Sequence, residues 1–486
     1  MRSKQRCIGK LDPETGELIP SKKREGNAAA LDKDITAYTS VSGPRILLQK
    51  VSEHIGLSNI LHKASPERWD QIMSLAWYIL CTGNALAHAG NWCENHETPC
   101  NKLLSSQRIS DLLGAISEDE RQKFFKLWGR RIAEKDYLCY DITSVSSYSE
   151  QNEYIRYGYN RDGESLPQIN FGMVYGQKSR LPVSYRQIQG SITDVKTLEH
   201  LISMFDKLEY PRLHLVMDRG FYSKTNIDQL CEKKFNFTIT VPSHLRWVKN
   251  EIDQFRDKMY GPEGYRKIGD QVLYVHSRLF SWGKRRCYAQ LFYNNKVDAE
   301  AKDEFIYNLL TYKEELETER RVPEHEEAYE RFFICKSTPK RGLQVEFNHP
   351  EIEAQQNRYA GFFMILTTKI KDPVDALMVY RQKDVVEKCF DNLKNTLDMK
   401  RLRVHNSYRM KSRLFIQFIA LILSSQIRKT IQEKLPQSSF SPKSLMQEME
   451  SLTTIHYAGK YKNRLSEISK KQRDILLAFD IDLDTL

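Results

Sequence analysis

The stretch from residue 136 to residue 243 most constrains how this chain can fold, because strand-like and helix-like segments follow one another there in a fixed order. Three segments rich in β-branched and aromatic residues come first, followed by a helical segment, a strand, a second helix and a further strand. In chain order they read YLCYDITSVSSYS, INFGMVYG, LPVSYRQIQG, DVKTLEHLISMFDKL, HLVMD, SKTNIDQLCEKK and FNFTITVPS. This β-β-β-α-β-α-β order predicts a mixed α/β fold built on a mixed sheet.

The rest of the chain predicts helical regions on both sides of this sheet and an interruption within it. The interruption contains strand-like runs and one strongly charged helical piece, after which the strand GFFMILTTK resumes the sheet pattern. We predict six regions: a basic arm with a β-hairpin (1–43), a helical domain (44–135), whose expected partner is given below, the first part of the core (136–243), a β-rich insertion (244–360), the second part of the core (361–430) and a helical C-terminal region (431–486).

The charge and composition of the chain favour a soluble protein that binds nucleic acid. The net charge is +11, which favours a polyanion, with nucleic acid first and an anionic membrane second. The N-terminal segment lacks an apolar core, so no secretory leader is expected. The longest apolar run, Leu414 to Leu423, is short for a membrane span and contains Gln417, which predicts a buried helix. We therefore expect a cytoplasmic, nucleoid-associated protein without membrane contact.

One group of potential zinc ligands lies in the segment AHAGNWCENHETPC. It contains His88, Cys93, His96 and Cys100, four soft ligands within thirteen residues. Their spacing fits no common zinc motif, and the nine cysteines of the chain show no paired pattern. The sequence therefore disfavours a zinc site here without excluding one.

Three carboxylates stand out by their positions. Asp141 lies in the first strand, Asp218 ends the fourth, and Glu387 lies in the helical segment VYRQKDVVEKCFDNLK after the insertion. The first and fourth strands can be neighbours, and a later helix can place one residue over their ends. Such a cluster of hard oxygen ligands suits two Mg²⁺ or Mn²⁺ ions and metal-assisted phosphoryl transfer. The alternative for Asp218 is an ordinary helix N-cap.

The helical segment around Glu387 carries a spaced signature. Tyr380, Lys383, Glu387 and Lys394 follow the pattern Y-x2-R-x3-E-x6-K, with lysine in the place of arginine. This pattern resembles the Tyr-Arg-Glu-Lys subgroup of bacterial insertion-sequence DDE transposases, and YDITS and MDRGFYS resemble the family's two aspartate strands. The resemblance covers roughly residues 136–430. It implies an RNase H-like core that carries a β-strand insertion.

The resemblance also implies roles for individual residues. Asp141, Asp218 and Glu387 would be the catalytic residues and the ligands of two Mg²⁺ or Mn²⁺ ions. Lys383 lacks the bidentate fork of arginine, for which the neighbouring Arg381 could compensate. An aromatic residue would receive a base that is turned out of the duplex. The expected DNA-binding residues in this part of the chain are Tyr380, Arg381, Lys383, Lys394, and Phe362 or Phe363, with Trp247 as the second choice for the aromatic.

The implied activity is cut-and-paste DNA transposition through nicking, hairpin formation and strand transfer at terminal inverted repeats. The partners would be double-stranded DNA, both terminal repeats and target, and a second copy of the chain in a synaptic complex. Loss of Tyr380, Lys383 or the stacking aromatic would then spare the first nick more than the hairpin.

Three other functional classes fit the sequence less well than transposition does. A DNA-binding factor derived from a transposase is disfavoured by the intact carboxylates, and an RNase H-like nuclease by the signature and the insertion. A tyrosine recombinase is disfavoured because VHNSYRMK lacks a His-x-x-Arg arrangement.

The N-terminal helical region is expected to recognise the transposon ends. SSQRISDLLGAISEDERQKFFKLW predicts two short helices around Gly114, which suits either a helix-turn-helix or an ordinary helical bundle. We expect residues 44–133 to carry sequence-specific recognition, with Gln107 and Arg108 reading base edges.

Overall fold

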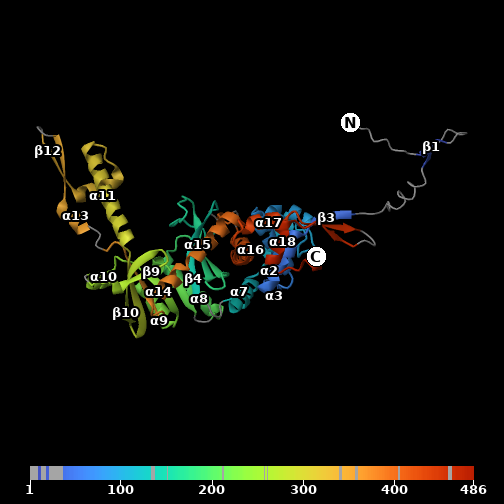
Figure 1. Cartoon of the computed structure of the whole chain (residues 1–486), viewed down its shortest axis with the longest axis horizontal. Helices are drawn as coiled ribbons and strands as arrows, with labels where there is room; N and C mark the ends of the chain where they lie inside the picture. Colours follow the sequence, from blue (N-terminus) through green and yellow to red (C-terminus); the bar gives the residue numbers. More distant parts are fainter. Residues whose placement is uncertain are drawn as a thin grey trace. The chain divides into compact units, whose positions relative to one another are not determined.

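The computed structural model divides into two compact units (Figure 1). The first combines residues 1–115 with residues 426–486, and the second spans residues 116–425. The described residues are 9–11, 18–20, 37–132, 137–149, 152–210, 213–256, 258–259, 261–338, 342–355, 359–402, 406–457 and 462–486.

Five strands form the core of the sheet in the second unit. They are β4 (Tyr137–Ser147), β5 (Gln168–Gly176), β6 (Pro182–Gln189), β7 (His214–Met217) and β8 (Asn236–Val241). Their spatial order is β6-β5-β4-β7-β8, with β5 antiparallel to both of its neighbours and β7 parallel to both of its own. Numbered along the chain, this order is 3-2-1-4-5, the arrangement of an RNase H-like core. The predicted α/β fold is confirmed.

Two helices make the crossovers between the parallel strands, as the sequence predicts. The helix α8 (Asp194–Lys207) leads into β7, and α9 (Lys224–Glu232) leads from β7 to β8. In α8 the buried residues recur at helical spacing, so one face packs on the sheet and the other meets water. The N-cap of α9 is Ser223, whose side chain accepts a hydrogen bond from the backbone N–H of Asn226.

Three strands of the predicted insertion join the core sheet instead of forming a separate module, which differs from the sequence-based division at 244–360. The strand β14 (Phe362–Thr367) pairs antiparallel with β8, and β11 (Arg285–Tyr293), β10 (Gln271–Trp282) and β9 (Tyr265–Ile268) continue the same sheet in that order. An unpaired edge on β8 would leave backbone N–H and C=O groups without partners, and β14 satisfies them.

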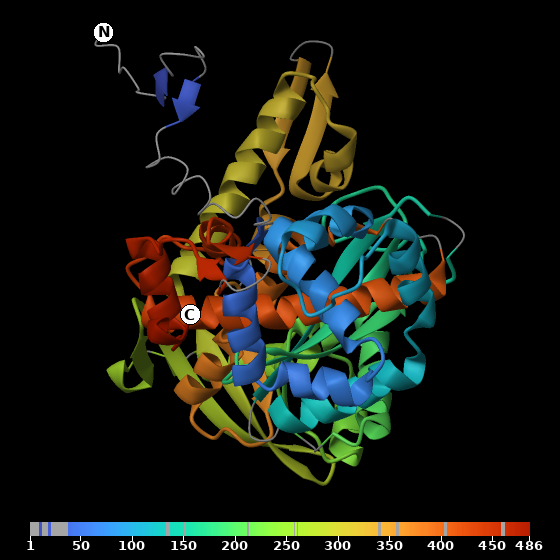
Figure 2. The ribbon, with the colours of Figure 1, turned by 90° about the vertical axis from the view of Figure 1, so that its right-hand side faces the viewer.

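The remainder of the insertion packs around a core of its own. It consists of α11 (Asn295–Glu317), α12 (Glu326–Phe332), β12 (Phe333–Thr338), β13 (Gly342–Phe347) and α13 (His349–Gln355). Figure 2 shows α11 lying alongside the β12–β13 hairpin. Their buried side chains form one apolar cluster, made of Leu309, Leu316, Tyr329, Phe332, Phe333 and Val345.

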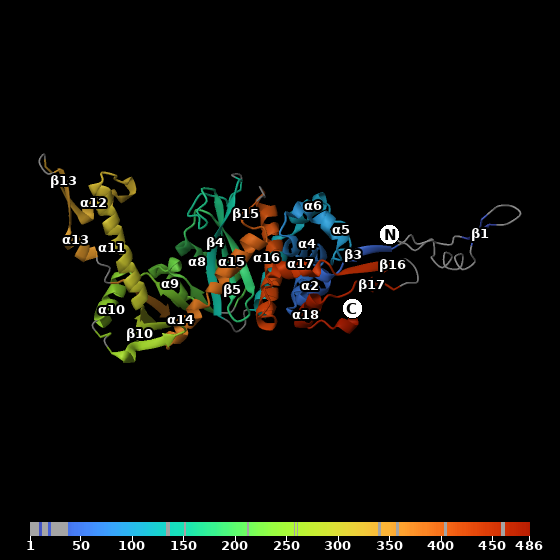
Figure 3. The ribbon, with the colours of Figure 1, turned by 45° about the horizontal axis from the view of Figure 1, so that its top comes forward.

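The signature segment VYRQKDVVEKCFDNLK, which the sequence predicts to be helical, is broken in the structure. The helix α14 (Pro373–Arg381) ends in a tight turn, α15 (Asp384–Asp391) follows, and a π-helical turn (Asn392–Thr396) completes the segment (Figure 3). The turn places Lys383 at the N-cap of α15 instead of inside a helix. Its position there becomes important for the site.

The helix α7 (Glu118–Ile132) belongs to the second unit, which moves a predicted boundary. Trp128 is fully buried and donates a hydrogen bond from Nε1 to the carbonyl of Pro182, at 2.8 Å. Phe125 packs edge-on against Tyr185 of β6. The last helix of the domain predicted for 44–135, α7, therefore belongs to the core. Because α6 (Ser106–Ala115) falls in the first unit, the two helices do not share one compact unit, as a helix-turn-helix would.

The first unit joins both ends of the chain, which the sequence-based division kept apart. Its strand β3 (Ala37–Val41) pairs antiparallel with β16 (Thr453–Tyr457), side by side in Figure 3. Its other elements are α2 (Gly43–His54), α3 (Leu57–Ala64), α4 (Trp69–Thr82), α5 (Ala89–Asn95), α6, α17 (Pro442–Met449), β17 (Arg464–Leu465) and α18 (Lys470–Ala478). The predicted hairpin of the N-terminal arm is present as β1 (Gly9–Leu11) and β2 (Leu18–Pro20), and most of the arm lies outside the described residues.

Two further predictions concern a membrane and zinc. The helix α16 (Ser407–Lys434) is long and apolar enough to cross a membrane, but 89% of its apolar window is buried within the protein, as expected for a core helix.

The possible zinc ligand His96 has other partners. It contacts the carbonyl of Trp92 through Nδ1 at 2.7 Å and the carboxylate of Glu450 through Nε2 at 2.5 Å. Both of its ring nitrogens are therefore engaged by groups other than the neighbouring cysteines.

Candidate active site

The sheet brings two of the three predicted carboxylates level with each other. In the parallel pair of β4 and β7, Cys139 lies opposite Val216. Asp141 and Asp218 each follow two residues later, so they lie side by side at the end of β7. The parallel pairing of the first and fourth strands thus brings together two residues that are 77 positions apart in the sequence.

Asp218 accepts three hydrogen bonds on one carboxylate oxygen. Its Oδ1 accepts from the backbone N–H of Arg219 at 2.7 Å, from the hydroxyl of Tyr380 at 2.9 Å and from that of Thr240 at 3.0 Å. The first contact caps a short 3-10 turn, so the cap that the sequence offered as an alternative is also present. Burial favours the neutral acid, but Lys383 and these hydrogen bonds outweigh it and lower the pKa of Asp218. Asp218 therefore remains a carboxylate at neutral pH.

The ammonium group of Lys383 lies among all three carboxylates. Its Nζ is 3.1 Å from Oε1 of Glu387, and 3.7 Å from Oδ2 of both Asp141 and Asp218. Two oxygens that lie this close to one nitrogen are at most twice that distance apart. The three acids therefore converge on one point, as the sequence predicts.

Lys383 is a buried cation that is held by its acidic neighbours. The residue is only 5% exposed. Burial alone would lower its pKa, but the charges of Asp141 and Asp218 and the hydrogen bond to Glu387 outweigh that effect, and the pKa of Lys383 is raised above its usual value. Lys383 is therefore positively charged at neutral pH.

Asp141 and Glu387 differ in their surroundings. Asp141 accepts a hydrogen bond from the backbone N–H of Ile142 at 2.8 Å, and burial raises its pKa although the charge of Lys383 opposes this. The side chain of Glu387 is 60% exposed in the first turn of α15. The site therefore has one shielded carboxylate, one that accepts several hydrogen bonds, and one that faces solvent.

The donor chemistry of the site fits divalent metal ions. Three carboxylates supply the hard oxygen ligands that Mg²⁺ and Mn²⁺ prefer, and Lys383 shows that a cation fits between them. Among the described residues, no three His, Cys, Asp or Glu side chains are arranged to hold an ion as they stand. In this site Lys383 lies between the acids, so its ammonium group has to withdraw before the three can share an ion.

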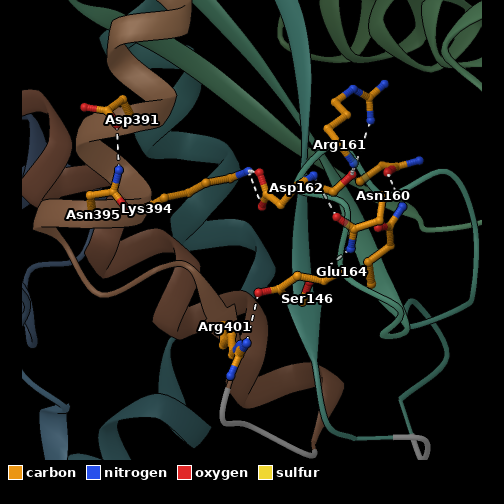
Figure 4. A network of polar contacts seen from close by, with 12 residues as sticks. Ser146, Asn160, Arg161, Asp162, Glu164, Asp391, Lys394, Asn395 and Arg401 are labelled. Atoms are coloured by element: carbon orange, nitrogen blue, oxygen red, sulfur yellow. Dashed lines mark hydrogen bonds and ion pairs between the residues drawn. The ribbon is translucent and has the colours of Figure 1, made fainter.

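The other residues of the signature segment contact protein groups. Tyr380 binds Asp218, and burial together with the charge of Asp218 raises the pKa of Tyr380 to about 12. Arg381 donates to Oε1 of Gln271 on β10 at 2.6 Å, so it does not substitute for Lys383 at the carboxylates. Lys394 lies 2.7 Å from both oxygens of Asp162 in the loop after β4 (Figure 4).

The structure reverses the preference among the candidate stacking aromatics. Phe362 is 7% exposed beside Tyr293, and the ring of Phe363 stacks on Phe292 with centroids 4.7 Å apart. Both lie on β14 within the sheet, where a flipped base would have to displace core packing. The structure therefore argues against the first choice made from the sequence.

Trp247, the second choice, is placed beside the loop that follows Asp218. It lies in α10 (Arg246–Arg256), is partly exposed, and donates from Nε1 to the hydroxyl of Tyr222 at 3.2 Å. Its ring stacks on Phe280 of β10 with centroids 5.3 Å apart. Because Tyr222 follows Asp218 by four residues, Trp247 is the better candidate for an aromatic close to the reacting strand.

Sequence reasoning missed two residues that support the site. Thr240 on β8 donates to Asp218, and Gln177 after β5 donates from Nε2 to the carbonyl of Val379 in α14 at 2.8 Å. No local motif marks either residue. Both become recognisable only when the neighbours of β7 and the path of α14 are known.

In this chain the first and fourth strands of an RNase H-like sheet and a later helix bring three acids together. This arrangement is the one that DDE enzymes have. The chain belongs to the Transposase DDE domain family, whose model matches residues 133–423. Among solved structures, a piggyBac transposase synaptic complex with hairpin DNA is similar at 11% identity and a TM-score of 0.39, over 84% of this chain and 76% of the other. A comparison with curated proteins finds no match.

Proposed function

We propose that the protein is a cut-and-paste DNA transposase of an insertion sequence, from the subgroup with the Tyr-Arg-Glu-Lys signature. It would act at terminal inverted repeats by metal-dependent nicking, hairpin formation and strand transfer. The observation that carries the proposal is the convergence of Asp141, Asp218 and Glu387 on one buried ammonium group, in a chain of the Transposase DDE domain family.

The residues of the site have distinct roles in this proposal. Asp141, Asp218 and Glu387 would hold two Mg²⁺ or Mn²⁺ ions, which supply Lewis-acid activation of the nucleophile and stabilise the leaving oxygen. Tyr380 and Thr240 fix one oxygen of Asp218 and so orient that carboxylate. Lys383 offsets the negative charge of the three acids before DNA is bound, and then turns its charge to the phosphate backbone.

The proposed partners are DNA and a second copy of the chain. The net charge of +11 supports binding to terminal repeats and target DNA. A homodimer would hold two ends together, and the protein would be cytoplasmic and associated with the nucleoid.

The experiment that tests the proposal is a gel assay on labelled ends of the element, with intact and pre-nicked substrates side by side. We expect a Mg²⁺-dependent nick, then a hairpin, and then joining of the released end to target DNA. Random duplexes of equal length should not be cut at a defined position. Cleavage that is independent of divalent metal, or nicking that never leads to a hairpin, would contradict the proposed pathway.

Trp247→Ala is expected to accumulate nicked ends in this assay, with hairpin formation slowed by about fivefold to a hundredfold. Stacking of a base on an aromatic ring contributes about 1–3 kcal/mol, and only the hairpin step needs an extruded base. Phe363→Leu is the matched control, since Phe363 lies within the sheet, and it should nick and form hairpins in the wild-type ratio. If Trp247→Ala slowed nicking and hairpin formation equally, the proposed stacking role of Trp247 would be contradicted.

Arg108→Ala is expected to weaken binding to the element's own ends by about fivefold to a hundredfold, while binding to random DNA changes little. Arg108 and Gln107 are exposed on α6, and a base-reading contact contributes about 1–3 kcal/mol of discrimination. The check is a competition binding assay. Lys123→Ala on α7 removes one exposed charge elsewhere and should affect both DNAs equally. Point variants are needed because removal of residues 1–133 would also remove β3, the partner of β16.

A further inference from the structure

The loop between β4 and β5 presents two tyrosine rings to solvent. Tyr157 is 66% exposed and Tyr159 is 82% exposed, although they are only two residues apart. A single exposed aromatic residue is common on protein surfaces, but two exposed rings two residues apart suggest a binding surface. A third ring, Tyr148, is 63% exposed at the start of the same connection, and the guanidinium of Arg401 lies 5.2 Å from its centre.

Residues 158–160 of the loop are held against both β4 and β5. The carbonyl of Tyr159 accepts a hydrogen bond from Nε2 of Gln168 at 2.8 Å, and Nδ2 of Asn160 donates to Oγ of Ser146 at 3.0 Å. A Cβ at Gly158 would lie 2.1 Å from the carbonyl oxygen of Gly190, so the loop backbone rests directly on that turn. These contacts fix the backbone and leave the two rings outside.

Two ion pairs fasten the loop to the chain segment that follows Glu387 (Figure 4). Lys394 pairs with Asp162 at 2.7 Å, and Arg401 pairs with Glu164 at 2.9 Å. The backbone N–H of Arg161 donates to Oγ of Ser144, three residues beyond Asp141 on β4. The loop is therefore connected to the active site both through β4 and through the signature segment.

We propose that Tyr157 and Tyr159 form a stacking platform for unstacked bases of the DNA strand beside the active site. This inference rests on the proposed function, which requires DNA with disturbed base stacking near the reacting phosphate. Aromatic rings bind bases of any sequence through their faces, and nearby arginines attract the backbone. The guanidinium of Arg161 lies 6.0 Å from the centre of the Tyr159 ring and is also paired with the carboxylate of Asp194.

The test measures binding without cleavage, with the full chain in EDTA and fluorescent DNA ends read by anisotropy. One DNA is fully paired, and the other carries a short unpaired stretch next to the expected cleavage site. The double variant Tyr157→Ala/Tyr159→Ala should bind the unpaired DNA about tenfold to a hundredfold more weakly, and the paired DNA less than about threefold more weakly. Tyr157→Phe/Tyr159→Phe should bind both DNAs like the wild type, because the rings remain.

A matched control is Tyr307→Ala on α11, since Tyr307 is 70% exposed and lies outside the loop. It should bind both DNAs like the wild type, and thermal unfolding should show that no variant is destabilised. Wild-type affinity of the alanine pair for unpaired DNA would overturn the platform. A loss with phenylalanine as large as that with alanine, or an equal loss on both DNAs, would overturn it as well.

The outcomes also separate this inference from the proposed function. If the wild type nicks its ends but the alanine pair binds unpaired DNA normally, only the platform fails. If the wild type never cleaves in Mg²⁺ while ring-dependent binding is present, the platform stands and the proposed function fails.

Discussion

Asp218→Ala is expected to reduce strand cleavage in Mg²⁺ by at least about a thousandfold, while DNA binding stays unchanged or becomes tighter. The carboxylate lies at the point where three acids meet and would be a metal ligand, so its removal acts on the chemical step. Binding does not need the ligand, and the loss of one negative charge next to a phosphate reduces repulsion.

Asp218→Asn separates the charge of this residue from its structural contacts. Asparagine keeps an oxygen that can accept hydrogen bonds from Tyr380, Thr240 and Arg219, so the thermal midpoint should change less than in the alanine variant. Cleavage should nevertheless fall as far as it does with alanine. Asp384→Asn is the control, because Asp384 is an exposed acid in the first turn of α15. Cleavage by Asp218→Asn at the Asp384→Asn rate would show that the site is assigned wrongly.

The strand order and the three acids could be predicted because each depends on a local pattern. The strands from residue 137 to residue 241 have buried, β-branched and aromatic residues, and the helices between them have apolar residues at helical spacing. When the first and fourth strands are neighbours, their pairing places Asp141 beside Asp218, and the conformation of the loops is not needed for this.

The contacts made by the signature residues could not be predicted from spacing. A helical pattern places Lys383 and Lys394 near the face of Glu387, but the turn after Arg381 directs Lys383 to the carboxylates, and the π-helical turn directs Lys394 to Asp162. Both contacts depend on interruptions of the helix that no residue type in this stretch predicts.

The pairing of distant segments could not be predicted from the sequence either. The contact between β3 and β16 joins residues more than 400 positions apart, and the union of β9–β11 with β14 depends on which edge of the sheet is open. The position of Phe362 and Phe363 in the chain is the feature that suggests them as stacking residues. Their burial follows from that same union of strands, since β14 lies between β8 and β11.

Lys383→Met is expected to have opposite effects on the metal-free and the metal-bound protein. Without its ammonium group the three carboxylates repel one another, and in EDTA the free energy of unfolding should fall by about 2 kcal/mol. This is less than for a fully buried pair, because Glu387 is exposed. Mn²⁺ should bind roughly tenfold more tightly, because no fixed cation competes for the same oxygens. Thermal unfolding in EDTA and in Mn²⁺, with Mn²⁺ binding followed by electron paramagnetic resonance, measures both effects.

The same variant revises an expectation that the family resemblance implies, namely that loss of Lys383 spares the first nick. If Lys383 contacted only DNA, its loss would spare the first nick and impair the hairpin. Because its ammonium group lies 3.1–3.7 Å from all three acids, its loss should slow both steps in similar proportion. Lys388→Met on α15 is the control for an exposed lysine, and Lys383→Arg should retain most of the metal-free stability. Weaker Mn²⁺ binding by Lys383→Met would mean that the lysine assembles the metal site instead of competing for it. A selective loss of the hairpin would restore a role on DNA alone.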